Sequence, residues 1–150
     1  AGPNGAANFP ILSTAYVESG NVVIKGWSRP GATLEFFLTD INEGTATSGD
    51  NELGNTKDYG EGQVYIGSAV EGSVADLDGG NSVYLDTDGN TDNTNLFEVH
   101  IPIPPGVEVG NLITGTATLA NTTSEFSPFS VIVIRTVITN RRITYRVNGN

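Results

Sequence analysis

The chain has 150 residues, enough for one domain with a core that needs no covalent staples. It contains no cysteine, which excludes disulfides and thiolate metal sites. Its 17 acidic and seven basic residues give a net charge of −10, and phosphate binding needs a basic face, so we expect no nucleic-acid partner. No apolar run approaches the roughly 20 residues of a membrane helix, so we expect no membrane span.

The distribution of charge along the chain is uneven. All acidic residues lie at or before Glu125, whereas four of the seven bases lie from Arg135 onward. Residues 1–134 therefore carry 3 − 17 = −14 and residues 135–150 carry +4. Such an asymmetry predicts that the two regions attract each other, within one molecule or between neighbouring molecules. The chain also lacks methionine and starts at Ala1, which we interpret as the result of signal-peptide removal and therefore as secretion to the cell surface or beyond.

Eight stretches are predicted to be β-strands, several of them from a two-residue apolar period, and no window shows a sustained helical period. In chain order they are 9–18, 21–28, 33–40, 63–68, 96–104, 111–120, 127–135 and 142–147. We expect the first of them at a sheet edge. In the third and fifth, Leu34, Phe36, Val99 and Ile101 should face inward. The run Val131–Ile134 is apolar at every position, which predicts a strand covered on both faces.

Many short strands with Gly/Pro turns predict an all-β immunoglobulin-like antiparallel β-sandwich over residues 1–134. Long Asp/Gly-rich loops interrupt it at 41–62 and 71–95, and a basic strand within 135–150 extends it. That extra C-terminal strand either pairs within its own domain or is donated to a neighbouring subunit by strand addition. The residues expected to mediate assembly are Arg141, Arg142, Ile143, Tyr145, Arg146 and Val147.

Three segments resemble bacterial immunoglobulin-like repeat domains of large secreted surface and adhesin proteins. They are Gly26–Asp40, Gly60–Ser68 and the closing Gly110–Ser127, which reads GNLITGTATLANTTSEFS. The resemblance covers about residues 10 to 130. It implies extracellular adhesion or structural spacing, often in tandem arrays and sometimes with bound calcium. The long Asp/Gly loops and the basic end depart from such a repeat.

Calcium is the one cofactor that the residues themselves suggest. Oxygen-bearing side chains recur every second residue at Asp86, Asp88, Asn90 and Asp92, with Asp76 and Asp78 shortly before them. Ca²⁺ takes roughly six to eight oxygen ligands, and a divalent ion would relieve the repulsion between these carboxylates. The alternative is a solvated acidic turn, which Asp, Asn and Gly also favour.

No pattern points to catalysis. The single histidine, His100, falls on the outward face of the fifth expected strand, and no Gly-x-Ser-x-Gly motif is present. Trp27 shares a face with Lys25, so it either packs under a loop or offers a carbohydrate platform. We therefore expect a non-enzymatic extracellular structural protein, a fibre subunit or adhesin repeat that binds copies of itself. The alternative is a calcium-stabilised module that binds a glycan or a cell-surface partner.

Overall fold

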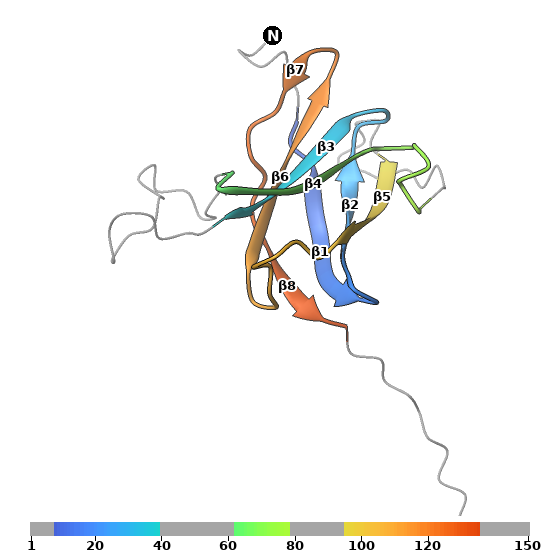
Figure 1. Cartoon of the computed structure of the whole chain (residues 1–150). Coiled ribbons are helices and arrows are strands. Elements are labelled where there is room, and N and C mark those ends of the chain that lie inside the picture. The colour runs from blue at the N-terminus through green and yellow to red at the C-terminus, as the bar shows by residue number, and fades with distance from the viewer. Residues whose placement is uncertain (1–7, 40–61, 79–94, 136–150) are drawn as a thin grey trace, which may run out of the picture.

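The computed structural model describes residues 8–39, 62–78 and 95–135. In this part of the chain there are eight strands and no helix, which confirms the all-β prediction (Figure 1). The strands are β1 (Ile11–Glu18), β2 (Asn21–Ser28), β3 (Thr33–Thr39), β4 (Val64–Val70), β5 (Asn95–Pro102), β6 (Leu112–Leu119), β7 (Thr122–Thr123) and β8 (Ser130–Ile134).

The strands form one continuous hydrogen-bonded path in the order β4-β3-β6-β8-β1-β2-β5, and β7 pairs with β6. The short strand β8 joins the two halves of this path, because it pairs with β6 on one side and with β1 on the other. The two ends of the path also approach each other, since the Ile101 side chain of β5 lies against Gly67 of β4. The sheet is therefore nearly closed into a barrel.

The expectation of a purely antiparallel sheet with 9–18 at its edge is wrong. β1 lies between β2 and β8, and it runs parallel to β8, with Ala15 opposite Ile132 and Tyr16 opposite Val133. Alternation assigns each side chain to a face but does not identify the strand that supplies the hydrogen bonds. Two segments more than a hundred residues apart become neighbours only when the sheet curls.

Two-residue turns connect the hairpins, and their backbone angles explain the residues found there. Ser19 and Gly20 join β1 to β2 with φ of 50° and 80°, and Ala120 and Asn121 join β6 to β7 with φ of 49° and 64°. Positive φ at both positions matches the right-handed twist of paired strands. Gly and Asn adopt this region readily, whereas an alanine there costs about 1 kcal/mol or more.

The core consists of alternate residues from both halves of the sheet, as the apolar pattern predicts. Leu34, Phe36, Val99 and Ile101 are all buried, and the rings of Phe36 and Phe97 lie 6.0 Å apart at an interplanar angle of 47°. Burying each side chain of this size contributes about 1.5–3 kcal/mol. The other buried apolar side chains of the core cluster include Val22, Ile24, Ile66, Ile113, Ala117 and Ile132.

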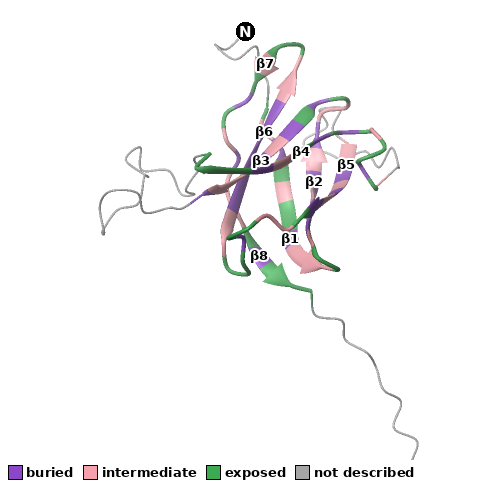
Figure 2. Cartoon of the chain, viewed as in Figure 1, coloured by how far each residue is buried: buried purple, intermediate pink, exposed green. Residues whose placement is uncertain are grey.

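The prediction that Val131–Ile134 is covered on both faces is wrong. Only Ile132 is buried, while Val131, Val133 and Ile134 are 42%, 48% and 69% exposed (Figure 2). No described layer packs over the outer side of β8, whereas consecutive residues of β2 and β6 are buried on both faces. A short run of β-branched residues thus reflects strand propensity here rather than two-sided burial.

The closing residues 124–127 are hydrogen-bonded to β6 through both backbone and side chains. The Ser124 and Ser127 hydroxyls accept hydrogen bonds from the backbone N–H groups of Ala117 and Gly115, each at 3.0 Å. The backbone N–H groups of the same two serines donate to the Ala117 and Gly115 carbonyls. Both serines are buried. They therefore continue the pairing of β6 beyond the two residues of β7.

Several predictions fall outside the described residues. The strand expected at 142–147 and all six assembly residues lie there, as do the loop residues 41–61 and 79–94. The boundary between residues 1–134 and 135–150 therefore stays a prediction, and so does the extra strand.

We expect Gly67→Ala to destabilise the fold by about 1–3 kcal/mol, the usual cost of overpacking. A Cβ atom at position 67 would come within 2.8 Å of the Ile101 side chain, which carries the contact between β4 and β5. Urea unfolding of Gly67→Ala, Ile101→Val and the double variant measures the effect. The double variant should recover part of the loss, because the two sites share one contact. If the losses of unfolding free energy in the two single variants simply add up in the double variant, β4 does not close onto β5 through this contact.

Candidate functional site

The turn that follows β4 is fixed by a buried carboxylate. Asp76 accepts backbone hydrogen bonds from Gly72 on Oδ2 at 3.0 Å, and from Asp78 and Glu98 on Oδ1 at 3.1 and 3.0 Å. Its backbone also bridges to Val99 in the antiparallel sense, and the Leu77 N–H donates to the Glu98 carbonyl at 2.8 Å. The three N–H partners offset most of the free-energy cost of burying this carboxylate. Because one partner belongs to Glu98 and the other two to Gly72 and Asp78, Asp76 attaches residues 72–78 to the outer edge of β5.

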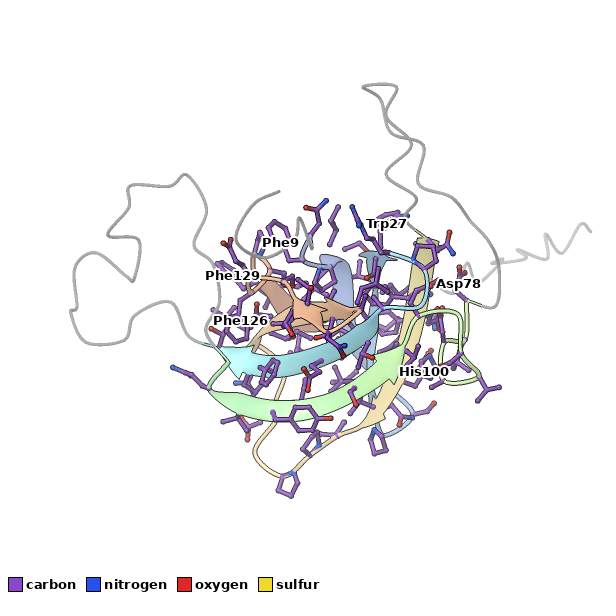
Figure 3. All side chains as sticks on the ribbon, turned by 90° about the horizontal axis from the view of Figure 1, so that it is seen from above. Phe9, Trp27, Asp78, His100, Phe126 and Phe129 are labelled. Carbon is purple, nitrogen blue, oxygen red and sulfur yellow. The ribbon has the colours of Figure 1, made fainter. Side chains whose placement is uncertain are left out.

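Asp78 has the opposite environment. Its Oδ2 atom is buried and has no hydrogen-bond partner. Partial burial raises the pKa of Asp78, and the charges of Asp76 and Glu98 raise it further, whereas Lys25 acts in the other direction. Of the six expected calcium ligands, only Asp76 and Asp78 lie within the described residues, and of these two Asp78 (labelled in Figure 3) has an oxygen without a hydrogen-bond partner.

The calcium site is only partly within the described residues. Asp76 and Asp78 do lie together, but Asp86, Asp88, Asn90 and Asp92 fall in the undescribed range 79–94. Within 8–39, 62–78 and 95–135, no three His, Asp or Glu side chains converge as a metal site would require. Calcium binding therefore stays a prediction.

A triad of polar side chains crosses the outer face of β2 and β5. Glu98 binds Lys25 Nζ through Oε2 at 2.6 Å and His100 Nε2 through Oε1 at 2.8 Å. The hydrogen bond from Lys25 lowers the pKa of Glu98, with a further contribution from His100, and the same contact raises the pKa of Lys25. Because Lys25 is directly opposite Glu98 in the ladder, the triad reinforces the register of these two strands.

Trp27 shares the outer face with Lys25, as the alternation predicts, and lies opposite Leu96 on β5. Its side chain is half-buried. Tyr16 of β1 points to the same face, since it is paired with Val23, and the Arg135 guanidinium lies 5.5 Å from its ring centre. Arg135 also forms an ion pair with Glu18. The face therefore offers two aromatic rings and several charged groups, and ligand binding by Trp27 stays a prediction.

An aromatic cluster on the outer side of β3 and β4 escapes the sequence pattern. The Phe37 ring contacts Tyr65 and Phe126 edge-on, with centroids 5.7 and 5.5 Å apart. A bulge between Phe36 and Phe37 in the pairing with β4 brings Tyr65 opposite Phe37. Bulges shift the faces of all later residues, so strict alternation cannot locate such a pair. Tyr65 remains 54% exposed.

The two edges of the sheet differ in how they are protected. Along β5, the 72–78 turn pairs with the edge at Glu98 and Val99, and Pro102 has no N–H to offer. β4 contains neither proline nor a charged residue, and three of its apolar residues, Val64, Tyr65 and Val70, are 40–54% exposed. Native sheets usually block such edges, because unpaired N–H and C=O groups recruit another strand.

Comparison with known proteins adds no family to this description. No family model matches the chain, and a search of curated proteins returns no significant relative. In the part of the chain that the structure covers, no helix is long and apolar enough to cross a membrane.

We expect Asp76→Asn to destabilise the fold by about 2–3 kcal/mol, because an amide cannot accept all three N–H groups and brings its own donors among them. Asp78→Asn is the matched control and should be neutral or stabilising by up to about 0.5 kcal/mol. Because the pKa of Asp78 is raised in the folded protein, its negative charge destabilises the fold. The stability gained by Asp78→Asn is therefore present above the folded pKa of Asp78 and disappears as the pH falls to the ordinary carboxyl value of 3.8. Thermal melts from pH 3 to pH 8 measure both effects.

The same melts test calcium. If Asp78 is a ligand, excess chelator lowers the melting temperature of the wild type and not that of Asp78→Asn. A melt of the wild type that chelator leaves unchanged rejects the calcium site. Equal losses in both aspartate variants would contradict the structural role given to Asp76.

Proposed function

We propose that this chain is a non-enzymatic extracellular structural module, a subunit or repeat of a surface fibre or adhesin that assembles by β-strand addition. The strand order supports an immunoglobulin-like sandwich. One half pairs β1-β2-β5 and the other pairs β4-β3-β6-β8, with β1 also joined to β8. Immunoglobulin-like sandwiches divide their strands in a similar way, with consecutive strands crossing between two sheets.

The observation that carries the proposal is the edge of β4, which touches β5 through side chains but has no hydrogen-bonded partner strand on that side among the described residues. The N–H of Glu71 donates to the Ala32 carbonyl, and antiparallel bonding alternates from there along the ladder. The pairs at Leu34 and Phe36 are therefore hydrogen-bonded, and the backbone N–H and C=O groups of Ser68 point away from β3. An incoming strand would pair with these groups and cover exposed apolar side chains at the same time.

The basic terminal segment suits this edge. Residues 142–147 alternate Ile143, Tyr145 and Val147 with arginine and threonine, and the six residues nearly match the seven of β4. The chain immediately before β4 is strongly acidic, with six acids and one base in residues 40–61. Opposite charges steer such a segment towards the edge and favour one partner over others. Donation from one end to an edge elsewhere on the next copy is heterologous, so it propagates into a filament.

The experiment tests the donated C-terminal segment and the accepting edge of β4 separately. A chain lacking residues 136–150 should fold and remain monomeric by sedimentation, and a synthetic peptide of residues 141–150 should bind it. Ser68→Pro should abolish peptide binding, because proline removes one outward N–H without disturbing the pairing with β3. Ser68→Ala keeps that N–H and should bind as the wild type does. A folded Ser68→Pro chain that still binds the peptide would show that β4 is not the acceptor.

A binding module is the second candidate, and the outer face of β1, β2 and β5 favours it. Trp27 and Tyr16 lie on this face with the Lys25–Glu98–His100 triad, a combination of aromatic and polar groups that suits carbohydrate. We expect a glycan array to detect any such ligand and Trp27→Ala to lose at least about tenfold in affinity, the equivalent of one stacking contact. An array without signal at high protein concentration would reject this candidate.

A further inference from the structure

A pocket of about 170 Å³ opens at the end of the barrel where the β2–β3 turn and the β6–β7 hairpin meet. Its walls include Ala32 and Ala117, which belong to the core cluster, together with Leu119 beside them. Small residues at the end of a curled sheet leave space that larger side chains would fill. Barrel mouths of this kind are common ligand sites in β proteins.

The three polar side chains among the residues that line the pocket can all donate hydrogen bonds. They are the guanidinium of Arg29, the side-chain amide of Asn8 and the hydroxyl of Thr122. None of the described residues that line the pocket is acidic. Ala120, which has the unfavourable left-handed backbone conformation, also contributes to the wall, so the hairpin holds this shape at a cost in stability.

Arg29 is the unexplained group at this site. Its Nε atom is buried and has no hydrogen-bond partner. Among the described residues Lys25 and Arg135 each form an ion pair, whereas Arg29 forms none. The buried carboxylate of Glu71, which contacts the same turn, accepts a hydrogen bond on Oε2 from the Gly31 N–H at 2.7 Å. Buried polar atoms in native proteins are nearly always paired, so an unpaired guanidinium nitrogen points to a missing partner.

We propose that this pocket binds an organic carboxylate, with Arg29 as the residue that recognises it. A guanidinium presents two parallel N–H groups that match the two oxygens of a carboxylate. Asn8 and Thr122 add hydrogen bonds at the rim, and the alanines and Leu119 receive the carbon skeleton. A carboxylate of this size could come from an acidic sugar or from the free C-terminus of a peptide. The site is independent of the β4 edge and of strand addition.

The experiment is an NMR titration of the whole chain at constant ionic strength, following backbone amides and the Arg29 Nε–H. Acetate, glucuronate and N-acetylglycine are the probes, and glucose and acetamide are their neutral counterparts. We expect saturable shifts at Arg29, Ala120 and Thr122 with the three carboxylates and none with the neutral compounds. Tighter binding of glucuronate than of acetate identifies an acidic sugar, and tighter binding of N-acetylglycine identifies a peptide terminus.

Variants decide whether Arg29 is responsible. Arg29→Gln should abolish the shifts, and Arg29→Lys should weaken binding about tenfold or more, because a lysine cannot form the paired contact. Arg135→Gln removes the same charge at a site outside the pocket and should change nothing. Thr122→Val tests the rim if Arg29→Gln fails to give a folded spectrum, and it should weaken binding several-fold. Carboxylate shifts that persist in a folded Arg29→Gln chain, or equal shifts with acetamide, would overturn the proposal.

Discussion

The ladder that β8 makes with β1 and β6 holds the two halves of this protein together. Ile132 is at its centre: its side chain is fully buried, its N–H donates to Asn111 at 2.9 Å, and its carbonyl accepts from Gly110 at 2.8 Å. On the other side β8 pairs in parallel with β1. Because one strand serves both halves, Phe36 and Phe97 can meet across the core. Without this ladder the apolar faces of β3 and β5 would each need another partner.

Such a path has two ends, and the chain treats them differently. At β5 the carboxylate of Asp76 organises a turn that pairs with the edge, and this requires a buried charge with three N–H partners. At β4 no described element takes that place, and apolar side chains remain in solvent. A sheet that blocks one edge with a dedicated turn and leaves the other open has an asymmetric surface. This asymmetry is the physical basis for preferring assembly to an inert spacer role.

The closing segment 124–127 is attached to the sheet by its side chains as well as by its backbone. Ser124 and Ser127 use both backbone and hydroxyl groups to attach the closing segment to β6, and Phe126 packs against Phe37. These residues stabilise the fold and take no part in ligand recognition that the structure describes. Function therefore has to be argued from the edge of β4, the Trp27 face and the Arg29 pocket.

The amino-acid sequence by itself determined seven of the eight described strands and most of the faces of their side chains, because the pleat of a strand repeats every two residues wherever the strand lies. The inward positions of Leu34, Phe36, Val99 and Ile101, the common face of Trp27 and Lys25, and the outward His100 all follow from that period. Only the tertiary structure decided which segments meet. The parallel neighbour of β1, the bond from Glu98 to Asp76 across 22 residues and the unpaired Arg29 depend on how the sheet curls. A local period contains no information on that curvature, which arises from packing between distant parts of the chain.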